Sequence, residues 1–345
     1  MPGVMRASEI TSFGRPEMLH FRDLPIPVIS EDEVLVRTHA IGVNFADVFA
    51  RLGYYPGIPK PPFVPGIEFS GEVVAVGGRV KSFRSGEKVF GFSKQNAYAE
   101  YVATPSTLVM PMPSRMSFEE AAAFGVTSLT AYHGMMNLAH AEKGESVLVH
   151  AAAGGVGTAA LQIAKHLNLK VFATVGSDEK LEFVRGMGAE VAINYSTQDF
   201  EKIVLRETGG NGVDVVMDSV GGRVFRKGWR LMAPMGRYVL FGFAAVAGEQ
   251  GVSKLRAAKE VISVPFVHPP SLVSKNVGLM GFNLYFLMQK AEYLQRAMRQ
   301  LLKWYEKGIV RPVIGATYPF DNIVEAHRFL QSRRSVGKVV VIVRS

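Results

Sequence analysis

The middle of the chain alternates between two apolar patterns. Short apolar runs with β-branched residues predict buried strands, and apolar positions at helical spacing between them predict helices. The expected strands cover residues 147–149, 170–174, 191–195, 213–218 and 238–243, and the expected helices cover residues 158–167, 178–187, 198–208 and 225–232. This alternation predicts an α/β fold with a doubly wound parallel sheet.

The first third of the chain has a different pattern, in which short strands are separated by proline and glycine corners. The expected strands cover residues 33–40, 66–77, 88–92 and 97–102. They predict a compact β-rich barrel. A short helix is expected between Asn44 and Gly53, because Asn favours a helix start and Gly a helix end. Two further helices are expected over residues 117–124 and 128–138, the first opening with a Ser-x-x-Glu capping box.

The last third is less regular. The expected elements are a strand at 277–284, helices at 291–307 and 320–331, and a strand at 337–343. The connection at 244–276 carries Lys254, Arg256 and Lys259 and an apolar stretch at 264–267. It permits three roles: a cap over a cleft, an interface between copies of the chain, or a membrane contact.

A glycine-rich turn follows the first strand of the middle region. Residues 151–157 read Ala-Ala-Ala-Gly-Gly-Val-Gly, with Ala152 where a G-x-G-x-x-G motif has its first glycine. A strand, a glycine turn and a helix together open a dinucleotide-binding unit, because a pyrophosphate binds backbone N–H groups at the helix N-terminus. The alternative is a tight turn that binds no ligand.

Composition narrows the chemistry. The 345 residues include no cysteine, which excludes disulfides, cysteine nucleophiles and thiolate metal ligands. The net charge is +9, but Lys and Arg are scattered, which favours a generally basic surface over a nucleic-acid site. The N-terminus shows no signal-peptide pattern, and the apolar runs are shorter than the roughly 20 residues that span a bilayer. We therefore expect a cytoplasmic enzyme.

Five stretches resemble the zinc-free quinone oxidoreductase (zeta-crystallin) family of medium-chain dehydrogenases/reductases. They are residues 43–47 with 53–56, 151–157, 193–195, 218–221 and 337–340. Residues 281–284 and the C-terminal third of the chain are most similar to the vesicle amine transport protein-like branch. The resemblance implies a GroES-like catalytic domain made of residues 1–125 and 285–345, a Rossmann domain at 126–284, and a homodimer, with the strand at 277–284 as a candidate sheet edge.

The resemblance also bears on metal binding. It places Asn44 where zinc-dependent relatives have a cysteine ligand, and Ile67 where they have a histidine. A catalytic zinc normally needs three protein ligands. The sequence therefore predicts an enzyme without zinc and with no other metal site.

The cofactor expected is NADPH rather than NADH. An acid at the tip of the second strand usually selects NAD, but that strand ends in Gly176 and Ser177, and Lys180 follows. The resemblance implies that Lys180 holds the 2′-phosphate, with Tyr195 beside it; the alternatives are a solvated lysine and a strand-end aromatic. The other cofactor contacts expected are Asn44, Thr130, Ala153, Gly154, Gly155, Val156, Gly157, Ser219, Phe241, Gly242, Phe282, Arg333 and Lys338. Thr130 as a plain helix residue and Arg333 as a surface charge remain the alternatives.

Without zinc or a flavin motif, hydride must pass directly to an acceptor such as a quinone or an α,β-unsaturated carbonyl. Tyr54 and Tyr55 are the candidate donors to the acceptor oxygen, with Asn44 orienting it. Asp47 either joins them or fixes the Asn44 loop by hydrogen bonds. Phe63, Phe92, Tyr98 and Phe243 either line an apolar pocket or pack in a core. Two other function classes stay open: a cofactor-binding structural or vesicle-associated protein with little turnover, and an RNA-binding protein.

Overall fold

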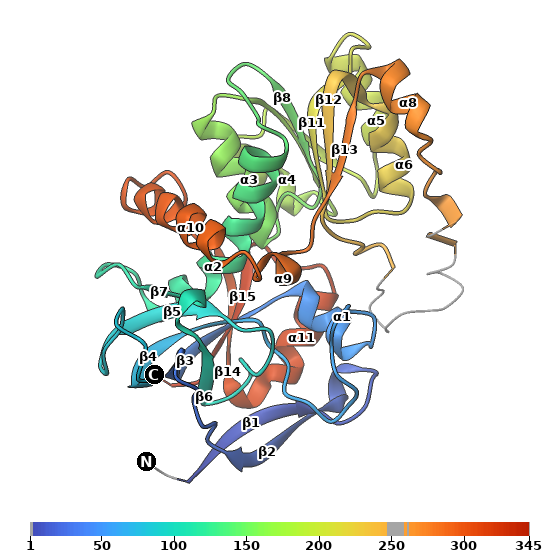
Figure 1. The fold of residues 1–345 in the computed structure, drawn as a ribbon. Coiled ribbons are helices and arrows are strands. Elements are labelled where there is room, and N and C mark those ends of the chain that lie inside the picture. Colours follow the sequence, from blue (N-terminus) through green and yellow to red (C-terminus); the bar gives the residue numbers. More distant parts are fainter. Residues whose placement is uncertain (1–2, 247–258, 261, 345) are drawn as a thin grey trace.

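The computed structural model describes residues 3–246, 259–260 and 262–344, and it shows two bodies that are each built on one sheet (Figure 1). The upper body holds β8 to β13. The lower body holds β3 to β7 with β14 and β15, and the β1–β2 hairpin lies beneath it. Lys254 and Arg256 of the 244–276 connection lie outside the described residues.

The lower sheet joins the two ends of the chain. Its order is β14-β15-β3-β4-β5-β7, and β6 also pairs with β3. The last strand runs antiparallel to β3 and places Val339 opposite Val43. The strands outside the upper sheet are β1 (Val4–Ile10), β2 (Leu19–Pro25), β3 (Glu33–Val43), β4 (Glu68–Val76), β5 (Lys88–Phe92), β6 (Tyr101–Pro105), β7 (Val109–Pro111), β14 (Ile314–Pro319) and β15 (Lys338–Ile342).

The upper sheet is parallel throughout, as the alternating pattern predicts. Its order is β10-β9-β8-β11-β12-β13, so the order reverses between β8 and β11. In such sheets a ligand binds outside the carboxyl ends of the strands at this switch point. The strands are β8 (Ser146–Val149), β9 (Lys170–Val175), β10 (Val191–Asn194), β11 (Val213–Asp218), β12 (Met232–Leu240) and β13 (Gly278–Gly281). The edge position predicted for 277–284 is confirmed, and the dimer through it stays a prediction.

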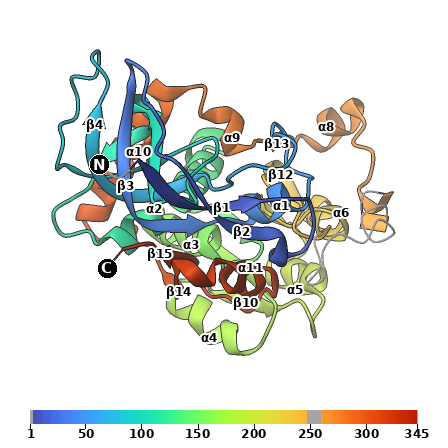
Figure 2. The same cartoon turned by 90° about the horizontal axis from the view of Figure 1, so that it is seen from below.

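Helices cover the upper sheet and connect the two bodies. Seen from below, α8 lies at the opposite end of the molecule from α10 (Figure 2). The helices are α1 (Phe45–Arg51), α2 (Phe118–Tyr132), α3 (Gly155–His166), α4 (Glu179–Gly186), α5 (Phe200–Glu207), α6 (Arg223–Arg230), α8 (Pro269–Lys275), α9 (Leu284–Leu287), α10 (Ala291–Glu306) and α11 (Ile323–Gln331), with short turns η1 (Pro16–Met18), η2 (Ser106–Leu108), η3 (His133–Leu138) and η4 (Phe320–Asn322).

The prediction of two helices over 117–138 is wrong. A single helix, α2, runs through Gly125 and continues into η3. A Cβ at Gly125 would lie 3.1 Å from the Phe92 ring, so this glycine permits close packing on the lower sheet and does not break the helix. The chain thus crosses the expected domain boundary at 125/126 inside a helix that packs on both β4 and α3.

Two strand predictions also need correction. The expected strand at 97–102 lies further along, as β6, and β14 is not predicted at all. The side chains of β14 alternate between half-buried and exposed, because it is an edge strand and lacks the buried apolar run on which such predictions depend.

Candidate functional site

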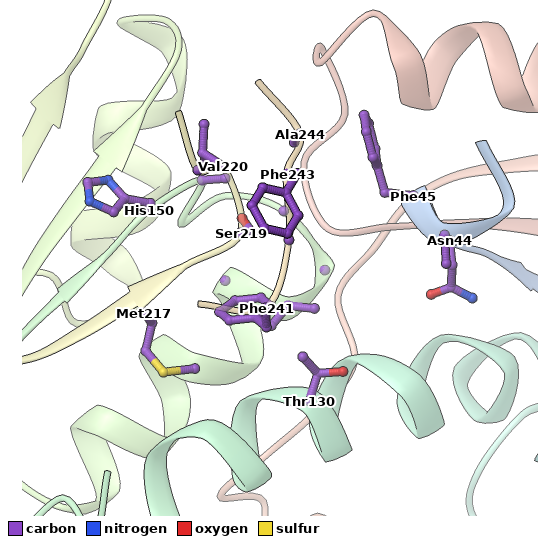
Figure 3. A pocket seen from close by; sticks show the side chains of 18 of the residues that line it. Asn44, Phe45, Thr130, His150, Met217, Ser219, Val220, Phe241, Phe243 and Ala244 are labelled. Carbon is purple, nitrogen blue, oxygen red and sulfur yellow. The ribbon is translucent and has the colours of Figure 1, made fainter. Parts of the chain in front are cut away.

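A cavity of about 920 Å³ lies between the two bodies. In Figure 3, Asn44 and Phe45 lie on one side of it, Ser219, Phe241 and Phe243 lie in the middle, and Thr130 of α2 lies below. The predicted site residues that line it are Asn44, Tyr54, Tyr55, Thr130, Ala153, Gly154, Gly155, Val156, Gly157, Gly176, Lys180, Tyr195, Ser219, Phe241, Gly242, Phe282, Arg333 and Lys338.

Two predicted site residues, Ser177 and Asp47, do not belong to this lining. The carbonyl of Ser177 accepts the N–H of Lys180 at 3.2 Å, so Ser177 begins the turn into α4. Asp47 is buried beneath the Asn44 loop, with 1% of its surface exposed. A direct contact with an acceptor is therefore not available to Asp47, and its alternative role as a loop-fixing residue fits its position.

The glycine turn ends where α3 begins, with Gly154 as its N-cap and no capping side chain. Among the described residues, no group accepts a hydrogen bond from the backbone N–H of Gly155, Val156 or Gly157. All three residues line the cavity. Unpaired N–H groups at the start of a helix attract an anionic group such as a phosphate.

The glycines of this turn differ in how much room the surrounding chain would leave for a side chain. A Cβ on Gly157 would lie 2.5 Å from the carbonyl oxygen of Ala152, and one on Gly155 would lie 2.8 Å from Thr127 Cγ2. These two glycines therefore let α3 approach the turn and α2. A Cβ on Gly154 would meet only the carbonyl oxygen of Ala151, at 3.3 Å, so Gly154 is the position that keeps the cavity side open.

Positive charge gathers where the cavity passes the end of β9. The Lys180 ammonium donates to the carbonyls of Arg333 at 2.7 Å and Ser335 at 3.0 Å, and burial lowers the pKa of Lys180. The nearby acid Asp178 accepts from the Asn194 side chain at 2.7 Å. The side chain of Arg333 donates to the carbonyl of Ala244 at 2.7 Å. Lys180 and Arg333 thus both line this end of the cavity, and the Asp178 side chain there is held by Asn194.

A buried polar cluster holds the opposite wall. The ammonium of Lys338 donates to Asn44 Oδ1 at 2.5 Å and to Glu68 Oε2 at 2.6 Å. Asn44 Nδ2 donates to the carbonyl of Gly42 at 2.9 Å and to Glu68 Oε2 at 3.2 Å, and the N–H of Val126 donates to Glu68 Oε1 at 2.6 Å. The phosphate contact predicted for Lys338 stays a prediction. Its side chain lies beside the glycine turn, where a Cβ on Gly155 would lie 3.6 Å from Lys338 Cδ, and its ammonium is paired with Glu68.

Asp47 belongs to a second buried network. Its Oδ2 accepts the N–H of Asn44 at 2.8 Å and the hydroxyl of Tyr98 at 3.1 Å, and the Tyr98 hydroxyl also contacts His327 Nε2 at 2.8 Å. Burial raises the pKa of Asp47 to about 7 even though the hydrogen bond from Asn44 and the charge of Lys338 act to lower it. The capping box of Asn44 and Asp47 thus fixes the start of α1 and the cavity wall.

A contact between the two bodies closes the far end of the cavity. The hydroxyl of Tyr55, in the loop after α1, donates to Asn283 Oδ1 at 2.8 Å. Asn283 caps α9, because the same oxygen accepts the N–H of Tyr285 at 2.9 Å. The rings of Tyr55 and Tyr285 meet edge to face, with centroids 5.8 Å apart, and burial raises the pKa of Tyr55.

Aromatic side chains line this same end. Phe241 stacks on Phe282 with ring centroids 5.8 Å apart, while Phe45 and Phe49 contribute from α1. Of the aromatic residues considered for an apolar pocket, only Phe243 lines the cavity; Phe63, Phe92 and Tyr98 are buried elsewhere.

Sequence reasoning missed several lining residues. The spacing of Phe45 and Phe49 would place both on one helical face, and Asn283 stands directly before a short helix, as an N-cap does. His150, at the left of Figure 3, also lines the cavity, and its Nδ1 lies 3.0 Å from Thr174 Oγ1. Burial lowers the pKa of His150, which fits the packing role expected for it.

The described residues contain neither a metal-binding cluster nor a membrane-spanning helix. Across residues 3–246, 259–260 and 262–344, no group of three or more His, Cys, Asp or Glu side chains could hold a metal ion. Within the same part of the chain, no helix has both the length and the apolar character needed to cross a bilayer.

Comparison with known proteins identifies the family. Residues 30–114 match the alcohol dehydrogenase GroES-like domain and residues 187–341 match the zinc-binding dehydrogenase family. The chain is 38% identical over 316 residues to the synaptic vesicle membrane protein VAT-1 homolog of Danio rerio, and this match covers 91% of the chain and 65% of that protein. It is 33% identical over 344 residues to the quinone oxidoreductase of Lama guanicoe, and this match covers 99% of the chain and 98% of that protein.

A solved structure agrees with these matches. Escherichia coli quinone oxidoreductase complexed with NADPH superposes with a TM-score of 0.86 at 30% identity, covering 98% of this chain and 100% of that one. The resemblance drawn from the sequence is thereby confirmed, together with the Rossmann-like parallel sheet and the GroES-like domain. The chain belongs to the medium-chain dehydrogenase/reductase family, in the group that contains the quinone oxidoreductases and the VAT-1 homologs.

Proposed function

We propose that this protein is a zinc-independent, NADPH-dependent oxidoreductase that transfers hydride directly to a quinone or an α,β-unsaturated carbonyl. One observation carries the proposal. The unpaired N–H groups at the start of α3 open into a cavity that has cations at one end and aromatic side chains at the other. A dinucleotide has this distribution of chemistry, with anionic phosphates between adenosine and an apolar nicotinamide.

The cavity residues fit NADPH. The N–H groups of Gly155, Val156 and Gly157 would hold the pyrophosphate, and the open side of Gly154 lets it approach. Lys180 lines the cavity close to the end of β9, and its positive charge favours an additional 2′-phosphate over a free ribose hydroxyl. The relative from Escherichia coli was solved with NADPH bound.

The residues do not fit a catalytic zinc. Asn44 uses both amide hydrogens and its oxygen in the buried cluster, and Ile67 offers no donor atom. Glu68 is paired with Lys338. We therefore infer that the zinc chemistry named in one family match is absent from this chain, and that no step of the reaction runs through a metal.

When bound, NADPH supplies a hydride. This hydride would add to the conjugated acceptor and leave an electron pair on the acceptor oxygen, and a proton from water would complete the reduction, with NADP+ as the other product. The protein positions the two reactants, excludes water with its aromatic wall, and places a hydrogen-bond donor near the oxygen that gains charge.

A second function class is favoured by the 38% identity to a VAT-1 homolog. On this alternative the chain binds NADPH but turns it over slowly, and its main role is in binding at vesicles or membranes. The two proposals share one cofactor site and differ in turnover and in the main role of the protein.

A spectrophotometric panel separates them. NADPH or NADH is mixed with the protein and with 1,4-benzoquinone, 9,10-phenanthrenequinone or a 2-alkenal, and cofactor oxidation is followed. The enzyme proposal expects NADPH oxidation with at least one acceptor and a higher kcat/KM with NADPH than with NADH. Tight NADPH binding without oxidation across the panel would instead support the binding protein.

A further inference from the structure

Many of the polar hydrogens at the aromatic end of the cavity are already used. Asn44 donates both amide hydrogens to Gly42 and Glu68, and the hydroxyl of Thr130 donates to the carbonyl of Val126 at 2.7 Å. The hydroxyl of Tyr55 donates to Asn283. Among the described residues at this end, the hydrogens without an acceptor belong to the hydroxyls of Tyr54 and Ser219, to the Asn283 amide nitrogen, and to the Lys338 ammonium, which already donates twice. The amide of Asn283 differs from the two hydroxyls in that other groups fix its orientation.

The orientation of the Asn283 amide is fixed by its neighbours. A backbone N–H can only donate, so the atom that the Tyr285 N–H meets at 2.9 Å must be the Asn283 oxygen. The same oxygen lies 2.8 Å from the Tyr55 hydroxyl, which must therefore donate to it. The other end of the amide, Nδ2 with its two hydrogens, has no described acceptor, and Asn283 lines the cavity.

We propose that Asn283 Nδ2 is the donor that binds the acceptor's carbonyl oxygen as charge develops on it, and that Tyr55 is a positioning residue that acts through Asn283. This inference rests on the proposed function. Developing charge is stabilised best by a donor whose orientation is fixed before the reaction, because no reorganisation is then needed. Two hydrogen bonds fix the Asn283 amide, whereas Tyr54 is 51% exposed and has no described partner for its hydroxyl.

The position of Asn283 suits this role. It follows Phe282, which stacks on Phe241 and provides a flat aromatic surface beside the amide. It also lies at the junction of the two bodies, because Asn283 follows β13 of the upper sheet and Tyr55 belongs to the loop after α1. A planar conjugated carbonyl would thus meet an aromatic face and an N–H donor at the same end of the cavity.

Asn283→Asp is the sharpest test. The aspartate keeps an oxygen for Tyr55 and for the N-cap of α9, and it replaces the N–H donor with an acceptor. We expect kcat/KM for the acceptor to fall ~100-fold, in line with the loss of one oxyanion donor, while NADPH affinity in a fluorescence titration stays unchanged. Tyr54→Phe tests the rival donor: a ~100-fold loss of kcat/KM there, with little loss in Asn283→Asp, would overturn the proposal.

A double-mutant cycle tests the role of Tyr55. If Tyr55 acts through Asn283, Tyr55→Phe lowers kcat/KM about tenfold in the wild-type chain but has no further effect in the Asn283→Asp background. Equal losses in both backgrounds would make Tyr55 itself the donor and would overturn the proposal. So would an Asn283→Asp variant that retains wild-type kcat/KM.

A spectroscopic measurement that needs no turnover distinguishes a wrong role for Asn283 from a wrong proposed function. Isotopically labelled cyclohexenone is bound to the NADP+-loaded protein and its carbonyl stretching band is recorded. The proposal expects a shift to lower wavenumber in the wild type, and no shift in Asn283→Asp. A wild type that turns over acceptors and shows no shift contradicts the role of Asn283 alone. A wild type with neither turnover nor a shift refutes the proposed function, and this inference with it.

Discussion

The two ends of the cavity are built in different ways. At the end proposed to hold the phosphates, the principal groups are backbone N–H donors of one continuous stretch, and Lys180 and Arg333 line the same cavity. At the acceptor end, the wall consists of side chains from α1 and its following loop, from α2, and from the segments after β12 and β13. The first end depends on the path of one turn. The second depends on buried polar contacts between segments far apart in the sequence.

This difference predicts which kind of substitution each end of the cavity tolerates. Backbone donors remain in place whatever side chains surround them, so the phosphate end is sensitive mainly to steric changes. At the acceptor end, Lys338 and Glu68 are 270 positions apart, and their ion pair is almost completely buried. Removing one member there leaves a buried charge without a partner.

The largest expected effect is the loss of stability when the buried ion pair of Lys338 and Glu68 is broken. Lys338→Met should lower the free energy of unfolding by roughly 4 kcal/mol, because it leaves Glu68 charged and unpaired inside the protein. Urea denaturation of the purified chain measures this loss. The double variant Lys338→Met/Glu68→Gln should regain part of the stability, and equal stability of the two variants would contradict the account.

A pair of glycine variants tests the phosphate end. Gly157→Ala should destabilise the chain by about 3 kcal/mol, because its Cβ would overlap the carbonyls of Ala151 and Ala152. Gly154→Ala has room within the protein and should leave thermal stability nearly unchanged. Its methyl group should nevertheless lower NADPH affinity in a titration. If the two variants lose stability equally, the glycines do not have the separate roles assigned to them.

The pH dependence of stability probes the acceptor wall. The pKa of Asp47 is about 7 in the folded chain and 3.8 in its ordinary state, so the folded state binds an extra proton between these values. Its contribution to stability is full below pH 3.8 and is lost as pH rises to about 7, by up to ~1.4 kcal/mol per pH unit.

Asp47→Asn removes this loss while keeping an oxygen for Asn44 and Tyr98. Burial lowers the pKa of the neighbouring His327, which makes stability rise with pH, so the difference between wild type and variant must be compared. Denaturation curves across this pH range should show that the free energy of unfolding of the variant increases relative to that of the wild type as pH rises. If the difference between the two unfolding free energies does not change with pH, the pKa of Asp47 is not raised in the folded chain.

The smallest effects are expected at the 2′-phosphate. Lys180→Ala should weaken NADPH binding about tenfold and leave NADH binding unchanged, since only NADPH carries the additional charge. Ser177→Ala serves as the control, because Ser177 does not line the cavity. Unchanged NADPH affinity in Lys180→Ala would remove this lysine from the cofactor site.

The sequence predicts features that arise from local patterns, and it does not predict contacts between residues far apart in the chain. The glycine turn, the strand and helix alternation and the Asn44 cap are local patterns, and the structure contains all of them. The contact of Lys338 with Glu68 depends on the register between β15 and β3, which no local pattern encodes. The donor at Asn283 likewise becomes visible only when Tyr55 and Tyr285 are seen to fix its oxygen.

Transfer of deuterium from NADPH tests the central claim most directly. NADPH that carries deuterium at both C4 positions of its nicotinamide is oxidised with a 2-alkenal by protein that has been dialysed against a zinc chelator. We predict that deuterium appears at the β-carbon of the product and that the chelator leaves the rate unchanged. Loss of the label to water, or activity that disappears with the chelator and returns with zinc, would contradict direct zinc-free hydride transfer.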